Sequence, residues 1–381
     1  MRGLSPVGRV GHDEATEATA GRANVNVRNG ELDGLRGWAA LVVAIFHTVL
    51  YVEPTQIQRI HSASWHSLHD AYSVMSKLFF TVFNGLTAVF IFFTLSGAVL
   101  FKSLIADNEP VRTLPVRFYV RRFFRIYPAL IVCLVASAIV FPILVREITL
   151  RQLAENVALA RFQVNGATWT LNAEMIAPAF ILLVFAGYRF AGEVGLVVAA
   201  GAISLLLKIP AVQAAFPYFE GAWLCFAFGT LVPTRIGAWV ANMLPRSSWI
   251  VVLVLVVFLR STLQHLAIAV LIALIYHRRA EALGRWLARP ISHFLGRISY
   301  SFYLFNMIFV EIICARAETL QFTRAHPIEV GLACSLAVVL LSVPVAYLSW
   351  AMIEMPFNRL GRWLTVGRAQ SPSTGVNEAS V

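Results

Sequence analysis

The chain has 381 residues, of which 58% are hydrophobic and only 13% are charged, and its mean hydropathy is +0.71. This composition excludes an ordinary soluble domain and predicts an all-α polytopic membrane protein. The net charge of +11 would also suit a protein that binds nucleic acid, but the cytoplasmic loops of membrane proteins carry the same basic excess. We therefore expect membrane lipids, and no nucleic acid, as partners.

The chain is predicted to have three regions. Residues 1–30 are rich in Ala, Gly, Thr, Asn and Arg and predict a disordered cytoplasmic tail, and residues 364–381 predict a second polar tail. Residues 31–363 carry the apolar runs and predict a bundle of about ten transmembrane helices. The spans are expected near 36–52, 78–101, 126–145, 168–187, 194–209, 220–233, 249–260, 262–276, 298–315 and 328–353. The turn after Arg260 leaves one bent re-entrant segment open as an alternative to two short spans.

The first span carries two costly polar residues, Arg36 and His47, and Asp33 just before it is the expected N-cap. Eleven residues make almost three helical turns, so both side chains face the same way. The imidazole is expected about 16 Å beyond the guanidinium, past the middle of a hydrocarbon core about 30 Å thick. The sequence therefore predicts a polar seam that enters the membrane from one side.

A basic segment lies between the second and third spans, where Arg117, Arg121 and Arg125 share one helical face beside Arg122. Arginine holds phosphate through a planar fork, so this face would suit the nucleotide end of coenzyme A. Anionic lipid at the membrane surface is the other interpretation of the same residues. In the second span, Ser96 and Gly97 are small residues of the kind that let another helix approach closely.

Glu174 is the acidic residue of the fourth span, and ionisable groups inside a bilayer usually face the bundle interior. We expect it at a depth comparable to that of His47, so the two side chains could meet. A carboxylate beside a histidine orients the ring for general-base catalysis. A structural hydrogen bond between helices is the alternative.

Two further patterns bear on cofactors and topology. Neither the four cysteines, which all lie in apolar runs, nor the loop histidines His61, His66 and His69 have the partners that a disulfide framework or a metal site needs. We expect no metal and solvated loop histidines. Placing both termini in the cytoplasm puts most of the 31 Lys and Arg residues on the inner side, which predicts a multi-pass protein of the inner (cytoplasmic) membrane.

Five short segments occur in an order that is typical of one known family. They are Leu32–Gly37 with His47, Phe92–Gly97, Arg121–Pro128, Thr168–Leu171 with Glu174, and Ile298–Leu304. Through them the chain resembles the integral-membrane acyltransferase family 3 over residues 31–363. Ile353–Pro356 also ends the last span as in that family.

The resemblance implies a membrane O-acyltransferase that moves an acyl group, usually acetyl from acetyl-coenzyme A, onto a hydroxyl of a carbohydrate, glycolipid or secreted metabolite. O-acetylation in polysaccharide modification is one such activity. It implies catalytic roles for His47 and Glu174 and donor binding by Arg36, Arg121, Arg122 and Arg125. Site support falls to Asp33, Ser96, Trp169 and Tyr303.

The chain departs from the family pattern at Asn306, where His is common, and at Met355, where Arg is common. The alternative function is a proton-coupled transporter or exporter in which Arg36, His47 and Glu174 form a relay. The bundle would act alone or with a separate extracytoplasmic partner.

Overall fold

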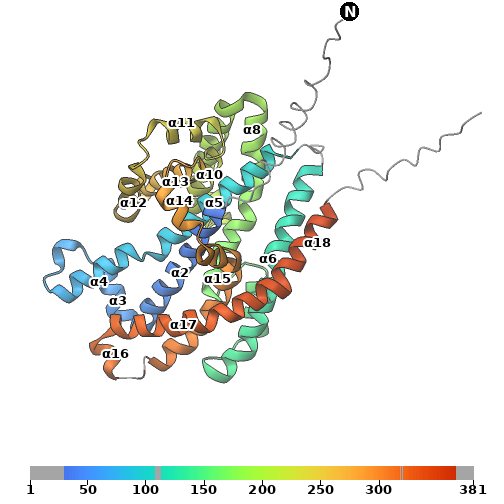
Figure 1. Cartoon of the computed structure of the whole chain (residues 1–381). Helices are drawn as coiled ribbons and strands as arrows, with labels where there is room; N and C mark the ends of the chain where they lie inside the picture. Colours follow the sequence, from blue (N-terminus) through green and yellow to red (C-terminus); the bar gives the residue numbers. More distant parts are fainter. Residues whose placement is uncertain (1–29, 108–112, 318, 320, 366–381) are drawn as a thin grey trace, which may run out of the picture.

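The computed structural model describes residues 30–107, 113–317, 319 and 321–365, and these residues form helices and no strand (Figure 1). The all-α fold is therefore confirmed. The two predicted disordered tails lie almost wholly outside the described residues and stay predictions. The helices are α2 (Gly30–Val52), α3 (Pro54–Ser62), α4 (Ala71–Val82), α5 (Gly85–Ile105), α6 (Leu114–Leu144), α7 (Leu150–Val157), α8 (Trp169–Leu206), α9 (Pro210–Ala215), α10 (Glu220–Leu231), α11 (Arg235–Met243), α12 (Ser248–Phe258), α13 (Ser261–Tyr276), α14 (Glu281–Leu287), α15 (Pro290–Ala317), α16 (Gln321–Ala325), α17 (Pro327–Ser349) and α18 (Met355–Thr365).

Helix length sets how many elements cross a membrane. Six helical stretches of the described chain are long and apolar enough, and the α10–α11 pair, bent by 82°, would be a seventh. At 11 residues, α12 covers about 16 Å, roughly half of the hydrocarbon core. It packs against α13 across a turn in which Ser261 has a φ of +59°. The predicted multi-pass bundle is confirmed, while the count of ten stays a prediction.

α8 reverses direction within its length. Ala191 and Gly192 leave the helical conformation, and Gly192 takes a φ of +59°, which glycine adopts without strain. Beyond this point the chain folds back, because a Cβ added at Gly187 would lie only 2.6 Å from the carbonyl oxygen of Gly195. The two halves correspond to the fourth and fifth predicted spans.

α2 lies at the centre of the bundle and packs against α5, α15 and α17. Its closest neighbour is α15, because a Cβ at Gly37 would meet the backbone nitrogen of Gly296 at 2.5 Å. Small residues at a helix crossing let two backbones approach in this way. The approach brings Arg36 to the face of α15 that carries Ser299 and Tyr303.

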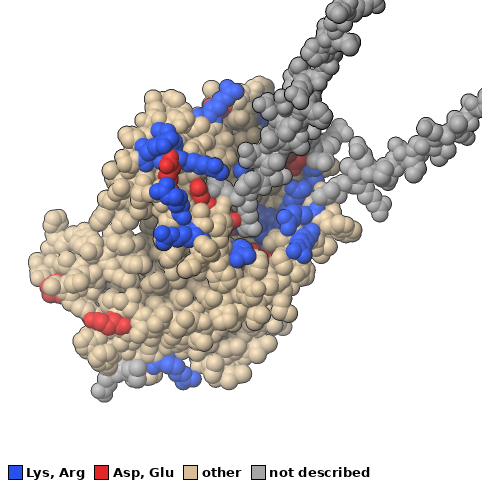
Figure 2. All heavy atoms as spheres, viewed as in Figure 1, with Lys and Arg blue, Asp and Glu red and all other residues tan. Residues whose placement is uncertain are grey.

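Charge divides the molecule into two ends. We call the end at which α2, α6 and α15 begin, and at which α5 and α18 finish, the basic end. Figure 2 shows Lys and Arg gathered over this upper part of the view, with few charges below. The opposite end carries α3, α16 and the last turn of α6 (Figure 1). This asymmetry supports the predicted orientation with the basic end inside.

Candidate active site

Two adjoining cavities enter the bundle from the basic end. The central pocket is narrow, with a cavity volume of about 40 Å³ between α2, α5, α6, α8 and α15. The basic vestibule, with a cavity volume of about 610 Å³, lies between the central pocket and the surface. Arg36 and Arg125 line both, so the two cavities meet at these side chains.

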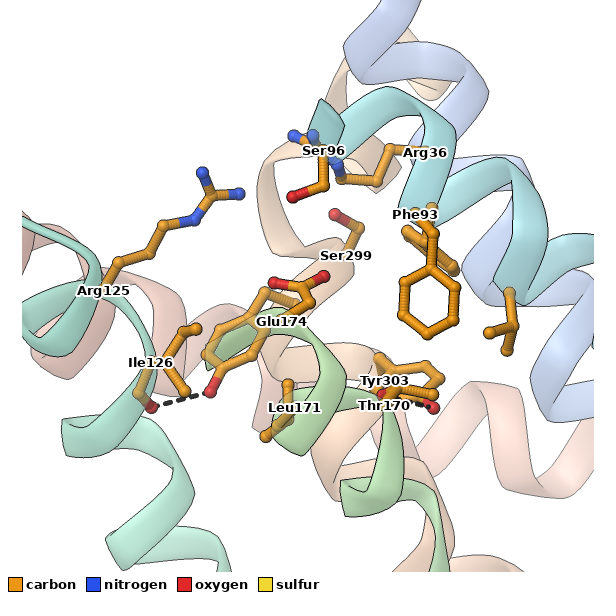
Figure 3. Close-up of a pocket in the computed structure, with 13 residues that line it drawn as sticks. Arg36, Phe93, Ser96, Arg125, Ile126, Thr170, Leu171, Glu174, Ser299 and Tyr303 are labelled. Carbon is orange, nitrogen blue, oxygen red and sulfur yellow. Dashed lines mark hydrogen bonds between the residues drawn. The ribbon is translucent and has the colours of Figure 1, made fainter. Parts of the chain in front are cut away.

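The central pocket holds several of the residues that the sequence singled out. Figure 3 shows the carboxylate of Glu174 pointing into the space between Arg36 and Arg125, with the hydroxyls of Ser96 and Ser299 close by. A guanidinium on either side compensates the charge of a buried carboxylate. The pocket therefore combines charged groups near the vestibule with an apolar and aromatic wall.

Tyr303 and Thr170 close the far end of the central pocket. The Tyr303 hydroxyl donates to the carbonyl of Ala167 at 2.9 Å. The Thr170 hydroxyl lies 3.0 Å from the Tyr303 hydroxyl (Figure 3). Tyr303 is 6% exposed and packs edge-on against Phe92. One turn further along α15, the amide of Asn306 donates to the carbonyls of its own helix.

Arg122 holds Glu174 in place. Its Nη2 lies 2.7 Å from Oε2 of Glu174, its Nε donates to the Glu174 carbonyl at 2.6 Å, and its side chain is 3% exposed. A weaker contact at 3.4 Å reaches the Ser96 hydroxyl. The guanidinium of Arg122 is buried and engaged by Glu174, and the predicted role of Arg122 in binding a donor stays a prediction.

The predicted contact between His47 and Glu174 is wrong. Glu174 lies at the level of Arg36, in the central pocket, whereas His47 lies three helical turns further along α2 and does not line that pocket. Among the described residues no hydrogen bond joins the two side chains. The His47 ring packs edge-on against Phe46 and Tyr51, and its buried Nδ1 has no hydrogen-bond partner in the part of the chain that the structure describes.

A carboxylate that the sequence analysis did not select, Glu311, lies on the His47 side of the bundle. Arg146 pairs with it at 3.2 Å and also donates to the carbonyl of Gln163 at 2.9 Å. Tyr51 lies within electrostatic range of both charges and contacts His47, with ring centroids 6.3 Å apart. The sequence could have indicated Glu311, because this carboxylate interrupts an apolar run in the predicted ninth span.

The basic vestibule carries more cations than carboxylates. Six cations line it, Arg36, Lys102, Arg121, Arg125, Arg359 and Arg362, against the two carboxylates Asp33 and Glu354. The Arg121 Nε donates to the Thr365 hydroxyl at 2.7 Å. Such an excess in a cavity favours an anionic ligand.

The N-cap role predicted for Asp33 is wrong. α2 already begins at Gly30, so Asp33 lies inside its first turn, where the helix dipole favours a carboxylate. Its Oδ1 lies 3.6 Å from the Arg36 guanidinium. Asp33 therefore helps to hold Arg36 at the junction of the two cavities.

Two other predicted residues serve packing. Gly97 lets α10 approach, because a Cβ there would meet the Phe226 carbonyl oxygen at 2.4 Å. Trp169 begins α8 and packs edge-on against Phe93 without lining the central pocket. The Ser96–Gly97 pair therefore has two functions, since Ser96 faces the pocket and Gly97 faces the neighbouring helix.

The comparison with protein families gives a single assignment. The family described as "Acyltransferase domain" matches residues 29–350, which include every residue that lines the central pocket. The chain belongs to this family. This acyltransferase is thus a multi-pass membrane enzyme, and the exporter alternative finds no support. No curated protein and no solved structure matches the chain. The family match ends before α18 begins.

Proposed function

We propose that this acyltransferase takes an acyl group, usually acetyl, from acyl-coenzyme A at the basic end. It transfers the group to a hydroxyl of a carbohydrate, glycolipid or secreted metabolite that arrives from the opposite end. The observation that carries the proposal is the basic vestibule, whose six cations lead into the central pocket through Arg36 and Arg125. Phosphates of the donor would bind in the vestibule through charge-assisted hydrogen bonds.

Donor length supports the same path. The pantetheine arm between the diphosphate and the sulfur has about 13 bonds and extends to about 15 Å, on the scale of three backbone bonds per 3.3–3.6 Å. Arg36 and His47 are separated by about 16 Å along α2. A diphosphate held at Arg36 and Arg125 therefore brings the thioester to the depth of His47. Because Tyr303 closes the central pocket, the arm would have to displace its ring.

His47 is the proposed general base. Within the described chain its buried Nδ1 makes no hydrogen bond, which leaves this nitrogen available to a reacting hydroxyl. In the direct route, His47 takes the proton of the acceptor hydroxyl while the oxygen attacks the thioester carbon. The carbon–sulfur bond then breaks, and coenzyme A leaves as a thiol with that proton. In the alternative route, His47 is itself acylated first and the acceptor then attacks the acyl-histidine.

Glu174 would have one role, and the ion pair of Arg146 with Glu311 would have another. Glu174, held by Arg122, balances the charge of Arg36 and Arg125 along the passage of the donor and acts as a positioning residue. Arg146, Glu311 and the exposed ring of Tyr51 lie on the side from which an acceptor would approach His47. Carboxylate and guanidinium groups bind hydroxyls well.

Thiol release from acetyl-coenzyme A tests the proposal without a known acceptor. The purified wild-type enzyme is expected to cleave the thioester slowly or to acylate itself, and His47→Ala is expected to abolish both. His265→Ala is the matched control, because His265 is also buried in the bundle but packs against Phe90 and lines neither cavity. Equal thiol release by wild type and His47→Ala would contradict the assignment of His47. An acyl group that accumulates on the wild-type protein would favour the second route.

A further inference from the structure

α18 presents three different faces. Asn358, Arg359 and Arg362 follow Met355 at helical spacings of three, four and seven residues, and all four line the basic vestibule. A second face packs on α6 through Gly361 and Thr365. A third face exposes an apolar stripe of Phe357, Leu360 and Leu364. A short helix of this kind lies at a membrane surface, with its polar face turned to the cavity.

Among the described residues, no carboxylate forms an ion pair with the cations on the vestibule face of α18. Within the described chain, Arg359 contacts only the sulfur of Met355 at 3.5 Å, and Arg362 forms no ion pair. The nearby carboxylates are engaged elsewhere, since Glu354 accepts from the Ser301 hydroxyl at 3.2 Å and Asp33 lies against Arg36. Two uncompensated guanidinium groups one turn apart form a site for a phosphate.

The position of α18 indicates which phosphate group of the donor would bind there. Arg36 and Arg125 lie at the junction with the central pocket, whereas Arg359 and Arg362 line the vestibule and not the central pocket. A π-helical turn over Trp350–Glu354 precedes α18, and such turns often occur at functional sites. From Glu354, beside Ser301, to Arg362 the helix leads about 12 Å away from the central pocket. A donor whose thioester points inward would place its nucleotide end along this stretch.

We propose that Arg359 and Arg362 of α18 form a binding site for the 3′-phosphate of coenzyme A and so determine donor specificity. The inference rests on the proposed function, because it takes coenzyme A as the donor. A phosphate monoester carries about 1.5 to 2 negative charges, more than either phosphate of the diphosphate bridge, and pairs well with two arginines. Because the family match ends at residue 350, this site is a feature of the chain beyond the matched domain.

Anionic lipid offers the same phosphate chemistry at the membrane surface. The two sources differ in one respect. A lipid phosphate site would bind phosphatidylglycerol and would ignore the 3′-phosphate of the nucleotide. A donor site would distinguish coenzyme A from dephospho-coenzyme A, which lacks only that phosphate.

The test is calorimetric titration of the purified full chain in neutral detergent with coenzyme A and with dephospho-coenzyme A. We expect the wild type to bind coenzyme A about tenfold to a hundredfold more tightly than dephospho-coenzyme A. The double variant Arg359→Gln/Arg362→Gln is expected to lose this preference and to bind both ligands as the wild type binds dephospho-coenzyme A. Arg289→Gln, an exposed arginine outside both cavities, is the matched charge control and should keep the preference.

Each other outcome overturns one claim. If the double variant keeps the preference, or if the wild type shows none, the 3′-phosphate site is wrong while coenzyme A binding stands. If neither ligand binds the wild type, the proposed donor is wrong and this inference falls with it. Repeating the titration in nanodiscs of phosphatidylglycerol and in nanodiscs of phosphatidylcholine tests the lipid source. A preference that is kept with phosphatidylcholine but lost with phosphatidylglycerol would show that anionic lipid occupies the site in a membrane, and would overturn its role in donor specificity.

Discussion

Glu174 and Arg122 illustrate how packing decides the role of a charged residue. The sequence placed Glu174 on a helix near His47, and both lie in membrane helices. Nothing in the sequence states that α6 would present Arg122 to the first turns of α8. The 2.7 Å ion pair follows from that packing.

Removing one partner of this ion pair should be costly. We expect Glu174→Gln to lower the free energy of unfolding by about 3–5 kcal/mol, because it leaves the Arg122 charge buried without its partner. Glu155→Gln is the control, since its pair with Arg151 is exposed and is worth about 0.5 kcal/mol or less. Denaturant unfolding in detergent measures both, and similar losses for the two variants would contradict the structural role.

His61 on α3 corrects the expectation of solvated loop histidines. It packs edge-on against Phe46 and Phe80. Burial lowers the pKa of His61, and the cations Lys77 and Arg260 lower it further. The folded chain therefore favours the neutral ring.

This lowered pKa predicts a pH dependence of stability. The unfolded chain binds a proton near its ordinary pKa of about 6.5, whereas the folded chain binds it only at lower pH. Stability should therefore fall as the pH drops from 7 through about 6.5 and below. We expect the melting temperature to fall more steeply for the wild type than for His61→Gln, with exposed His66→Gln resembling the wild type. Parallel curves for wild type and His61→Gln would rule this out.

Among the elements, hydropathy and spacing predicted most spans but not their geometry. Glu174 lies within α8, as its predicted span required. Arg117, Arg121 and Arg125, expected on one face of α6, line a third cavity between α5 and α6. The reversal inside α8 depends on the backbone at Gly192, which hydropathy does not report. α18 was missed as a separate element because it is short and mixed in polarity.

The crossing of α2 and α15 gives a prediction for the element scale. Gly37→Ala should lower the free energy of unfolding by about 1–3 kcal/mol, because its Cβ would lie 2.5 Å from the Gly296 nitrogen. Gly221→Ala on α10 meets nothing within 4 Å and should raise stability by about 0.5–1 kcal/mol. Thermal unfolding of both variants checks the prediction. Equal effects would show that the two helices do not meet through glycine.

At the scale of the whole molecule, the asymmetry of charge predicts the orientation in the membrane. Alkaline phosphatase is active only outside the cytoplasm. Fused after Val381 it is expected to be inactive, and inserted after Ser67, at the opposite end, it is expected to be active, because basic loops stay inside. The reverse pattern of activities would place the donor cavities on the outer side and would contradict the proposed path.

Much of this arrangement followed from order and composition in the sequence. The family, the all-α fold and the multi-pass character were predicted, and Arg36, Ser96, Glu174 and Tyr303 do lie around one pocket. The contributions of Glu311, Arg359 and Arg362 were not predicted. Glu311 pairs with Arg146, far away in the chain, and the other walls of the vestibule around Arg359 and Arg362 come from α2, α5 and α6, so no local spacing reports these arrangements.

The most direct test of the account uses proteoliposomes in which the enzyme has one known orientation. Acetyl-coenzyme A is supplied on one side at a time, and released thiol is measured for wild type and His47→Ala. The account predicts thiol release only when the donor is on the side of the basic end, and none from His47→Ala on either side. Release with the donor on the opposite side, or release that survives the loss of His47, would contradict it.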